Sequence, residues 1–175
     1  MVLRRIGLMV AICLSLMLKA GSMTIAAESV GIEIIAHRGA SYDAPENTMP
    51  SFQLGWQQQA DAVELDIMLS KDGKIVVIHD KDTKRLAGVD RPVVEQTFEE
   101  LRGLDVGRWK DARFAGTRVP ALSEVLATIP EGKRLFIEIK CGEEILPELK
   151  RDLAAAKRPS AQTVLISFSA KVMAA

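Results

Sequence analysis

Chemically active side chains stand at or near the ends of four apolar segments of this sequence. They comprise two histidines, two cationic side chains and four carboxylates: His37, Arg38, Glu64, Asp66, His79, Asp80, Glu138 and Lys140. Imidazoles exchange protons near neutral pH, and carboxylates are the usual oxygen ligands of divalent cations. If the fold brings the four segment ends together, this set predicts a site for acid–base or metal-assisted chemistry.

The spacing of the acids indicates where they point. Glu64 and Asp66 are two residues apart in AVELDIML, so in a strand both side chains lie on one face and the flanking apolar residues on the other. Glu138 and Lys140 repeat this pattern in LFIEIK. Three carboxylates aimed into one sheet interior would repel one another and lose hydration. A divalent cation relieves both costs, and an all-oxygen ligand set favours Ca²⁺ or Mg²⁺ over zinc.

Each feature also has a simpler interpretation. A single histidine at a strand end is usually structural, an isolated Glu-Leu-Asp is typical of a half-exposed edge strand, and Glu138 with Lys140 could form an ordinary ion pair of little energetic value. These interpretations become weak in combination, because four separate segments would have to end in such residues by coincidence. The carboxyl ends of strands are also where active sites form in α/β folds.

The elements that would position these residues alternate along the chain. Apolar, β-branched runs predict strands at residues 32–36, 62–69, 74–79, 135–140 and 163–168. Asn47 or Thr48 can cap a helix with Pro50 in its first turn, and further helices are expected from the TFEEL and ALSEVLATI segments and over residues 147–157. Nearly continuous apolar strands separated by helices predict a parallel sheet covered on both faces.

One connection is too short for a helical crossover. The SKDG segment (residues 70–73) links the second and third predicted strands, which favours a local hairpin. With a two-residue turn at Asp72 and Gly73, Asp66 would stand opposite His79.

Composition and the N-terminus limit the functional class. Acidic and basic residues balance, and no basic stripe predicts a nucleic-acid partner. Arg4 and Arg5 precede an uncharged apolar run at residues 6–18, which is typical of a secretory signal. We therefore expect a signal peptide at residues 1–27, a domain at residues 28–175, export to the periplasm or medium, and no stable membrane insertion after cleavage. Cys141 would then be the remaining cysteine, which excludes an intramolecular disulfide.

Five segments together resemble the glycerophosphodiester phosphodiesterase family, within the phospholipase C-like phosphodiesterase superfamily. They are HRG (37–39), PENT (45–48), ELDI (64–67), SKDGKIVVIHD (70–80) and FIEIK (136–140). Their order and spacing match the family as well, and the resemblance covers about residues 33–168. Taken together the segments are far more specific than HRG or ELD alone.

The resemblance implies a TIM-type (β/α) barrel and metal-dependent hydrolysis of a small glycerophosphodiester to sn-glycerol 3-phosphate and an alcohol. It also implies a role for each matching residue. The metal ligands would be Glu64, Asp66 and Glu138, the acid–base pair His37 and His79, the phosphate contacts Arg38 and Lys140, and a rim residue Glu46. Acid and base could be assigned to the two histidines in either order.

The sequence also departs from the family pattern. The family barrel has eight strands, whereas we predict five here, so we expect the barrel to be truncated after the fifth strand. Residues 86–96 match the family least well and are expected over the site mouth. Two alternatives follow: a related phospholipase-like phosphodiesterase acting on another lipid headgroup, or an inactive truncated barrel that acts as a binding module.

Overall fold

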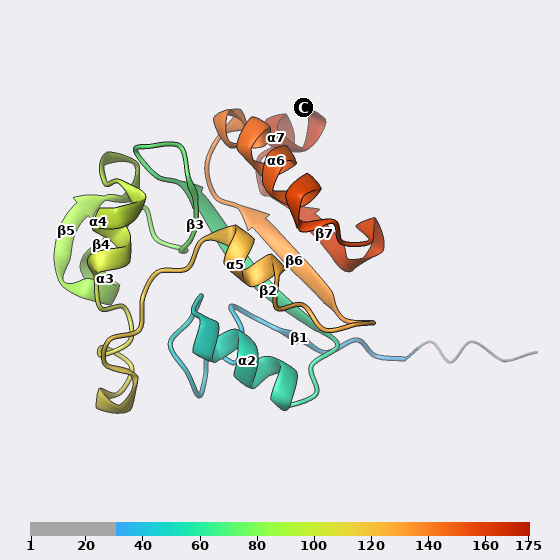
Figure 1. Ribbon diagram of the computed structural model, residues 1–175, viewed down its shortest axis with the longest axis horizontal. Helices are drawn as coiled ribbons and strands as arrows, with labels where there is room; N and C mark the ends of the chain where they lie inside the picture. The colour runs from blue at the N-terminus through green and yellow to red at the C-terminus, as the bar shows by residue number, and fades with distance from the viewer. Residues whose placement is uncertain (1–30) are drawn as a thin grey trace, which may run out of the picture. The chain divides into compact units, whose positions relative to one another are not determined.

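In a computed structural model of the chain, which describes residues 31–175, the sheet is built around strand β2 (Ala62–Leu69). Strands β1 (Ile35–Ala36) and β6 (Arg134–Ile139) both pair with β2 in parallel, and β7 (Thr163–Ile166) pairs with β6 in parallel. The resulting order β1-β2-β6-β7 follows the chain, as in an α/β barrel (Figure 1). The predicted α/β class is confirmed. The predicted signal peptide lies outside the described residues and stays a prediction.

The helices bury one face of this sheet. They are α2 (Met49–Gln57), α5 (Leu122–Leu126), α6 (Leu146–Ala156) and α7 (Ala170–Ala174). Phe52 of α2, Leu126 of α5 and Leu149 of α6 share one apolar cluster with Leu65 of β2 and Ile137 of β6. Within residues 31–175, no helix combines the length and apolar character that crossing a bilayer requires.

Coverage of the other sheet face differs from the prediction. Strand β2 is buried along almost its whole length, but β6 alternates between buried and half-buried residues. The half-buried positions include Phe136 and Glu138, which point away from the helical face. Continuous burial on both faces is therefore wrong for β6, because this face carries the polar site.

The short SKDG link does form a hairpin, with a register that differs from the predicted one. Strand β3 (Ile75–Val77) pairs antiparallel with the end of β2, with Ile67 opposite Val77 and Leu69 opposite Ile75. The N–H of Ser70 donates to the carbonyl of Lys74, so three residues form the loop, with Gly73 at a φ of +74°. The register therefore places Ile78, not His79, opposite Asp66, and the N–H of Ile78 donates to the carbonyl of Asp66.

Residues 81–121, here called the β3–α5 segment, form a second small unit of structure. Its strands β4 (Asp82–Thr83) and β5 (Val89–Pro92) make an antiparallel ribbon that the sequence patterns did not predict. Its helices are α3 (Lys84–Ala87) and α4 (Phe98–Gly103), the latter with the predicted Thr97–Glu100 capping box. These elements gather at one end of the main sheet (Figure 1). Within residues 31–175, the 3₁₀ turns are Val93–Glu95, Ala112–Phe114, Glu143–Ile145 and Ser160–Gln162.

The β3–α5 segment is attached to the sheet by its own apolar cluster. Leu86 of α3 and Leu101 of α4 pack with Val76 of β3 and with Ile78, which follows that strand. At its far end the segment returns to β3, where Ala121 bridges Val76. Both ends of the segment are therefore fixed beside the strand that leads to His79.

The first predicted helix begins where expected, and the structure decides between its two candidate caps. Thr48 is the N-cap of α2, Pro50 lies in the first turn, and the N–H of Thr48 donates to Ser51 Oγ. Asn47 is instead turned inward at a φ of +56°. Gly39 lies against this turn at a φ of +77°, and a Cβ there would stand 2.6 Å from the carbonyl carbon of Ser51.

We expect Gly39→Ala to destabilise the fold far more than Gly73→Ala. Both glycines have positive φ, which costs an alanine about 1–2 kcal/mol. A Cβ at Gly73 would meet no atom within 4 Å, whereas at Gly39 it would collide with Ser51, adding roughly 1–3 kcal/mol of overpacking. Urea unfolding of both variants measures the difference, and equal losses would contradict the close contact.

Candidate active site

The three predicted metal ligands meet in space. Glu64 and Asp66 extend from one face of β2, and the β2–β6 register places Glu138 directly beside Asp66. One carboxylate oxygen from each residue lies within 4.8 Å of the other two. Glu64 and Asp66 are buried and Glu138 is nearly so. The parallel pairing of two strands thus gathers three acids that lie up to 74 residues apart in the sequence.

The electrostatics of this carboxylate cluster fit a divalent cation. Burial, reinforced by the neighbouring Asp66 carboxylate, raises the pKa of Glu64 from its ordinary 4.5 to about 7. Glu64 Oε1 and Asp66 Oδ1 are both buried without a hydrogen-bond partner. Buried carboxylate oxygens without partners are costly, and a hard cation would satisfy them.

Two cationic side chains partly balance the acids. Arg38 Nε lies 3.3 Å from Asp66 Oδ2, and the backbone N–H of Arg38 donates to Glu64 Oε2. Lys140 Nζ donates to Glu138 Oε1 at 2.9 Å and lies 3.8 Å from Asp66 Oδ1. The predicted phosphate-binding residues therefore do lie at the carboxylate cluster, Arg38 just after β1 and Lys140 just after β6, on the two sides of β2.

Asn47 also belongs to the site, although the sequence patterns suggested only a helix cap. Its Nδ2 donates to Asp66 Oδ2 at 2.8 Å, and its Oδ1 accepts the backbone N–H of Asp66 at 3.1 Å. Asn47 is buried and occupies the edge of β2 between β1 and β3. Its residue type could have indicated a role in the turn, because asparagine tolerates the left-handed backbone conformation that this turn requires.

The two histidines stand in different surroundings. His37 follows β1, its side chain is 67% exposed, and its Nε2 lies 3.9 Å from Glu64 Oε2. His79 follows β3, is 30% exposed, and its Nδ1 is hydrogen-bonded to Asp80 Oδ1 at 2.8 Å. His37 therefore lies beside the carboxylate cluster, whereas the orientation of the His79 ring is fixed by its hydrogen bond to Asp80.

Glu46 connects the surroundings of the two histidines. Its Oε1 accepts hydrogen bonds from Arg38 Nη1 and from Arg85 Nη2, and its Oε2 accepts one from Arg85 Nη1. Burial would raise the pKa of Glu46, but the hydrogen bonds and charges of Arg85 and Arg38 outweigh it and hold that pKa below its usual value. Arg85 also donates to Asp80, so a continuous chain of ion pairs runs from His79 to Arg38.

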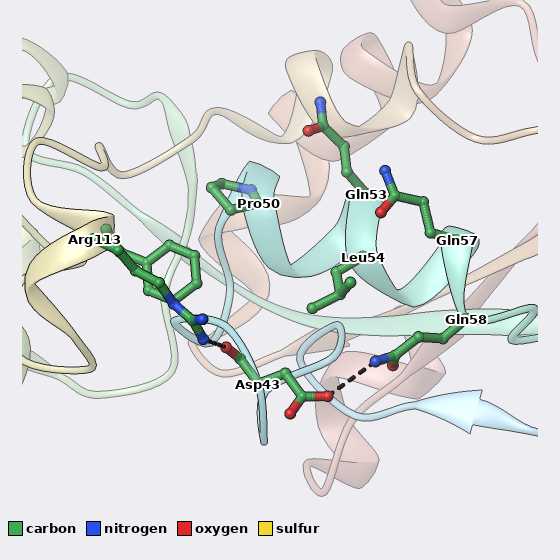
Figure 2. A pocket seen from close by; sticks show the side chains of 8 residues that line it. Asp43, Pro50, Gln53, Leu54, Gln57, Gln58 and Arg113 are labelled. Carbon is green, nitrogen blue, oxygen red and sulfur yellow. Dashed lines mark hydrogen bonds between the residues drawn. The ribbon is translucent and has the colours of Figure 1, made fainter.

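A large groove lies elsewhere on the surface. Figure 2 shows it beside α2, where Asp43 Oδ2 accepts from Gln58 Nε2 and the carbonyl of Asp43 accepts from Arg113 Nη2. Glutamine side chains and the partly buried Pro50, Leu54 and Phe114 complete its wall. None of the residues predicted for the site lines this groove, so the carboxylate cluster, with its unpartnered acids, remains the candidate active site.

The sequence of this chain matches the model of the glycerophosphoryl diester phosphodiesterase family over residues 37–164. The chain belongs to this family. It is 41% identical over 124 residues to a glycerophosphodiester phosphodiesterase of Caldanaerobacter subterraneus, a match that covers 70% of this chain and 51% of that protein. The first curated relatives are therefore matched over about half of their length.

Solved structures of the family show the same fold. A glycerophosphodiester phosphodiesterase of Agrobacterium tumefaciens is 36% identical with a TM-score of 0.71, covering 81% of this chain and 60% of that chain. A phosphodiesterase of Oleispira antarctica in complex with sn-glycerol-3-phosphate is 32% identical with a TM-score of 0.77, covering 82% and 60%. These relatives are TIM barrels, and the predicted fold type is confirmed.

We expect the metal-free protein to lose stability as pH rises from about 4.5 to 7. The folded state raises the pKa of Glu64 from 4.5 to about 7 and so favours its protonated form. That stabilisation is complete below the pKa of Glu64 in the unfolded state. It is lost as pH rises through the pKa of Glu64 in the folded state.

Thermal melts in the presence of chelator measure this dependence. The melting temperature of Glu64→Gln should change less with pH in this window than that of wild type. At pH 8 it should be higher than that of wild type. Glu95→Gln, an exposed site outside the carboxylate cluster, is the matched control. If the melting temperatures of wild type and Glu64→Gln changed with pH in parallel, ionisation of Glu64 would not destabilise the carboxylate cluster.

Proposed function

We propose that this chain carries the catalytic residues for hydrolysis of glycerophosphodiesters to sn-glycerol 3-phosphate and an alcohol. The observation that supports this most strongly is the meeting of Glu64, Asp66 and Glu138 with Arg38 and Lys140 beside the middle of β2. A phosphodiester is an anion, and an all-acid site would repel it. Cations at the carboxylate cluster reverse that preference and favour phosphate binding.

We propose Ca²⁺ or Mg²⁺ as the resident cation, because all three side-chain ligands offer carboxylate oxygens. When bound, such a cation supplies electrostatic stabilisation for the phosphoryl oxygens. The chain's own cations add to it. Arg38 offers a planar guanidinium suited to phosphate oxygens, and Lys140, directly after β6, offers a point charge.

The two histidines would carry the protons. In-line displacement forms one P–O bond and breaks another, so one proton leaves the attacking oxygen and one reaches the departing alcohol. We assign the base to His37, which would take the proton from water or from the substrate's own 2-hydroxyl. We assign the acid to His79, which would protonate the leaving oxygen. If the 2-hydroxyl attacks, a cyclic phosphate forms first and water then opens it with the two roles exchanged.

The β3–α5 segment would border the departing alcohol, since it begins two residues after His79 and returns beside β3. Residues 89–92 of the weakly matching region form an edge of its ribbon. We therefore propose that this segment influences which alcohol is accepted, and that the substrate is a small soluble diester.

We expect the protein to release glycerol 3-phosphate from glycerophosphocholine when Ca²⁺ or Mg²⁺ is present, and this release to stop when chelator is added. His37→Ala and His79→Ala should each lower kcat at least about a hundredfold, because each removes one proton transfer. Gln57→Ala, in the groove beside α2, is the control and should keep wild-type turnover.

A panel of substrates separates the alternatives. Cleavage of a phosphoinositide or sphingolipid diester in preference to glycerophosphocholine would favour a related phosphodiesterase. Binding of these diesters without turnover under any cation would favour a binding module. Near-normal turnover by His79→Ala would refute the two-histidine mechanism.

A further inference from the structure

The ion-pair chain between His79 and Arg38 has a chemical consequence at its first link. Asp80 uses both carboxylate oxygens: Oδ1 contacts His79 Nδ1 at 2.8 Å, and Oδ2 accepts from Arg85 Nε at 2.7 Å. The hydrogen bond from Arg85 is the largest influence on this carboxyl and, with His79, holds the pKa of Asp80 below its usual value despite partial burial. Asp80 is therefore ionised at neutral pH.

An ionised carboxylate can accept hydrogen bonds but cannot donate one. The contact between Asp80 Oδ1 and His79 Nδ1 is then a hydrogen bond only if Nδ1 carries the proton. That leaves Nε2 as the nitrogen of His79 that gains or loses a proton. A histidine ring without such a partner has no comparable preference for Nδ1–H.

We propose that Asp80 and Arg85 are positioning residues, which hold His79 with its proton on Nδ1 and its Nε2 free to exchange a proton with the substrate. The role at the substrate rests on the proposed function, whereas the state of the ring does not. Nothing in the sequence patterns indicated Arg85, which lies in α3, 39 residues beyond Glu46.

The geometry of Arg85 explains why an arginine is required there. Its guanidinium makes one hydrogen bond to Asp80 and two to Glu46, and it lies 5.5 Å from the centroid of the Trp109 ring. Lysine has a single nitrogen and cannot span two carboxylates with this fork. Arg85 is 42% exposed, and ion pairs at that exposure contribute little to stability. The arrangement therefore serves orientation more than folding.

The far end of the chain of ion pairs ties His79 to the carboxylate cluster. Glu46 also accepts from Arg38, whose Nε lies 3.3 Å from Asp66. The position of the His79 ring is thus fixed relative to the residues proposed to bind phosphate, across segments that share no strand pairing. Arg85 is the link that the β3–α5 segment contributes.

Nitrogen-15 NMR of the histidine rings tests this directly, and the chain's two histidines make assignment simple. At a pH where both rings are neutral, His79 should show the Nδ1–H tautomer in wild type. Asp80→Asn should shift His79 toward Nε2–H, because an amide can donate to Nδ1. Arg85→Lys should give a mixture of tautomers. His37 provides an internal reference that should not change.

Lys84→Met is the matched control, since Lys84 adjoins Arg85 in α3 but pairs with Asp90 instead. It should leave the His79 tautomer as in wild type. In turnover assays, Asp80→Asn should lower kcat about tenfold to a hundredfold, as loss of a histidine's orienting partner usually does, with little change in KM. Lys84→Met should keep both constants.

An Nε2–H tautomer of His79 in the wild-type chain would overturn the proposal without any variant. So would an unchanged Nδ1–H tautomer in a folded Asp80→Asn chain. If that variant does not fold, wild type and Arg85→Lys decide. Absence of turnover in wild type would count against the proposed function. The tautomer measurement tests the protonation of the His79 ring independently of turnover.

Discussion

Mutual repulsion among three carboxylates is the constraint around which this structure is arranged. Glu64, Asp66 and Glu138 place oxygens within 4.8 Å of one another on a mostly buried face. Arg38 and Lys140 reduce the repulsion but leave two buried oxygens without hydrogen bonds. The pKa of Glu64 is raised because burial and the neighbouring carboxylates disfavour its ionised form. A fold that keeps such a cluster must hold the acids rigidly enough that they cannot turn away.

The backbone around the cluster shows how this rigidity is achieved. Strand β1 pairs with the first two residues of β2 and β3 with the last three, so the middle of that edge has no strand beside it. Turns fill the gap: Arg38 and Gly39 donate backbone hydrogen bonds to Glu64, and Asn47 pairs with Asp66 through its side-chain amide. Arg38, Gly39 and Asn47 all have positive φ. At Arg38 and Asn47, which are not glycine, this conformation is strained, and such strain is typical of functional sites.

Much of this site could be predicted from the sequence because strand periodicity fixes which residues share a face. Glu64 with Asp66, and Glu138 two residues before Lys140, needed only alternation and a parallel sheet. The hairpin register could not be predicted, because a three-residue loop closed at Gly73 and a two-residue turn fit the same letters. The strands β4 and β5 are short and polar, so they left no periodic signal. Asn47 and Arg85 act through tertiary contacts that no local pattern reveals.

Calorimetric titration of the metal-free chain with Ca²⁺ and Mg²⁺ at pH 8 measures whether Glu64, Asp66 and Glu138 bind a divalent cation. We expect one binding site in wild type, with affinity at least about tenfold weaker in Glu138→Gln and unchanged in Glu95→Gln, which lies outside the carboxylate cluster. Wild-type affinity retained by Glu138→Gln, or no binding of either cation to the wild-type chain, would contradict it.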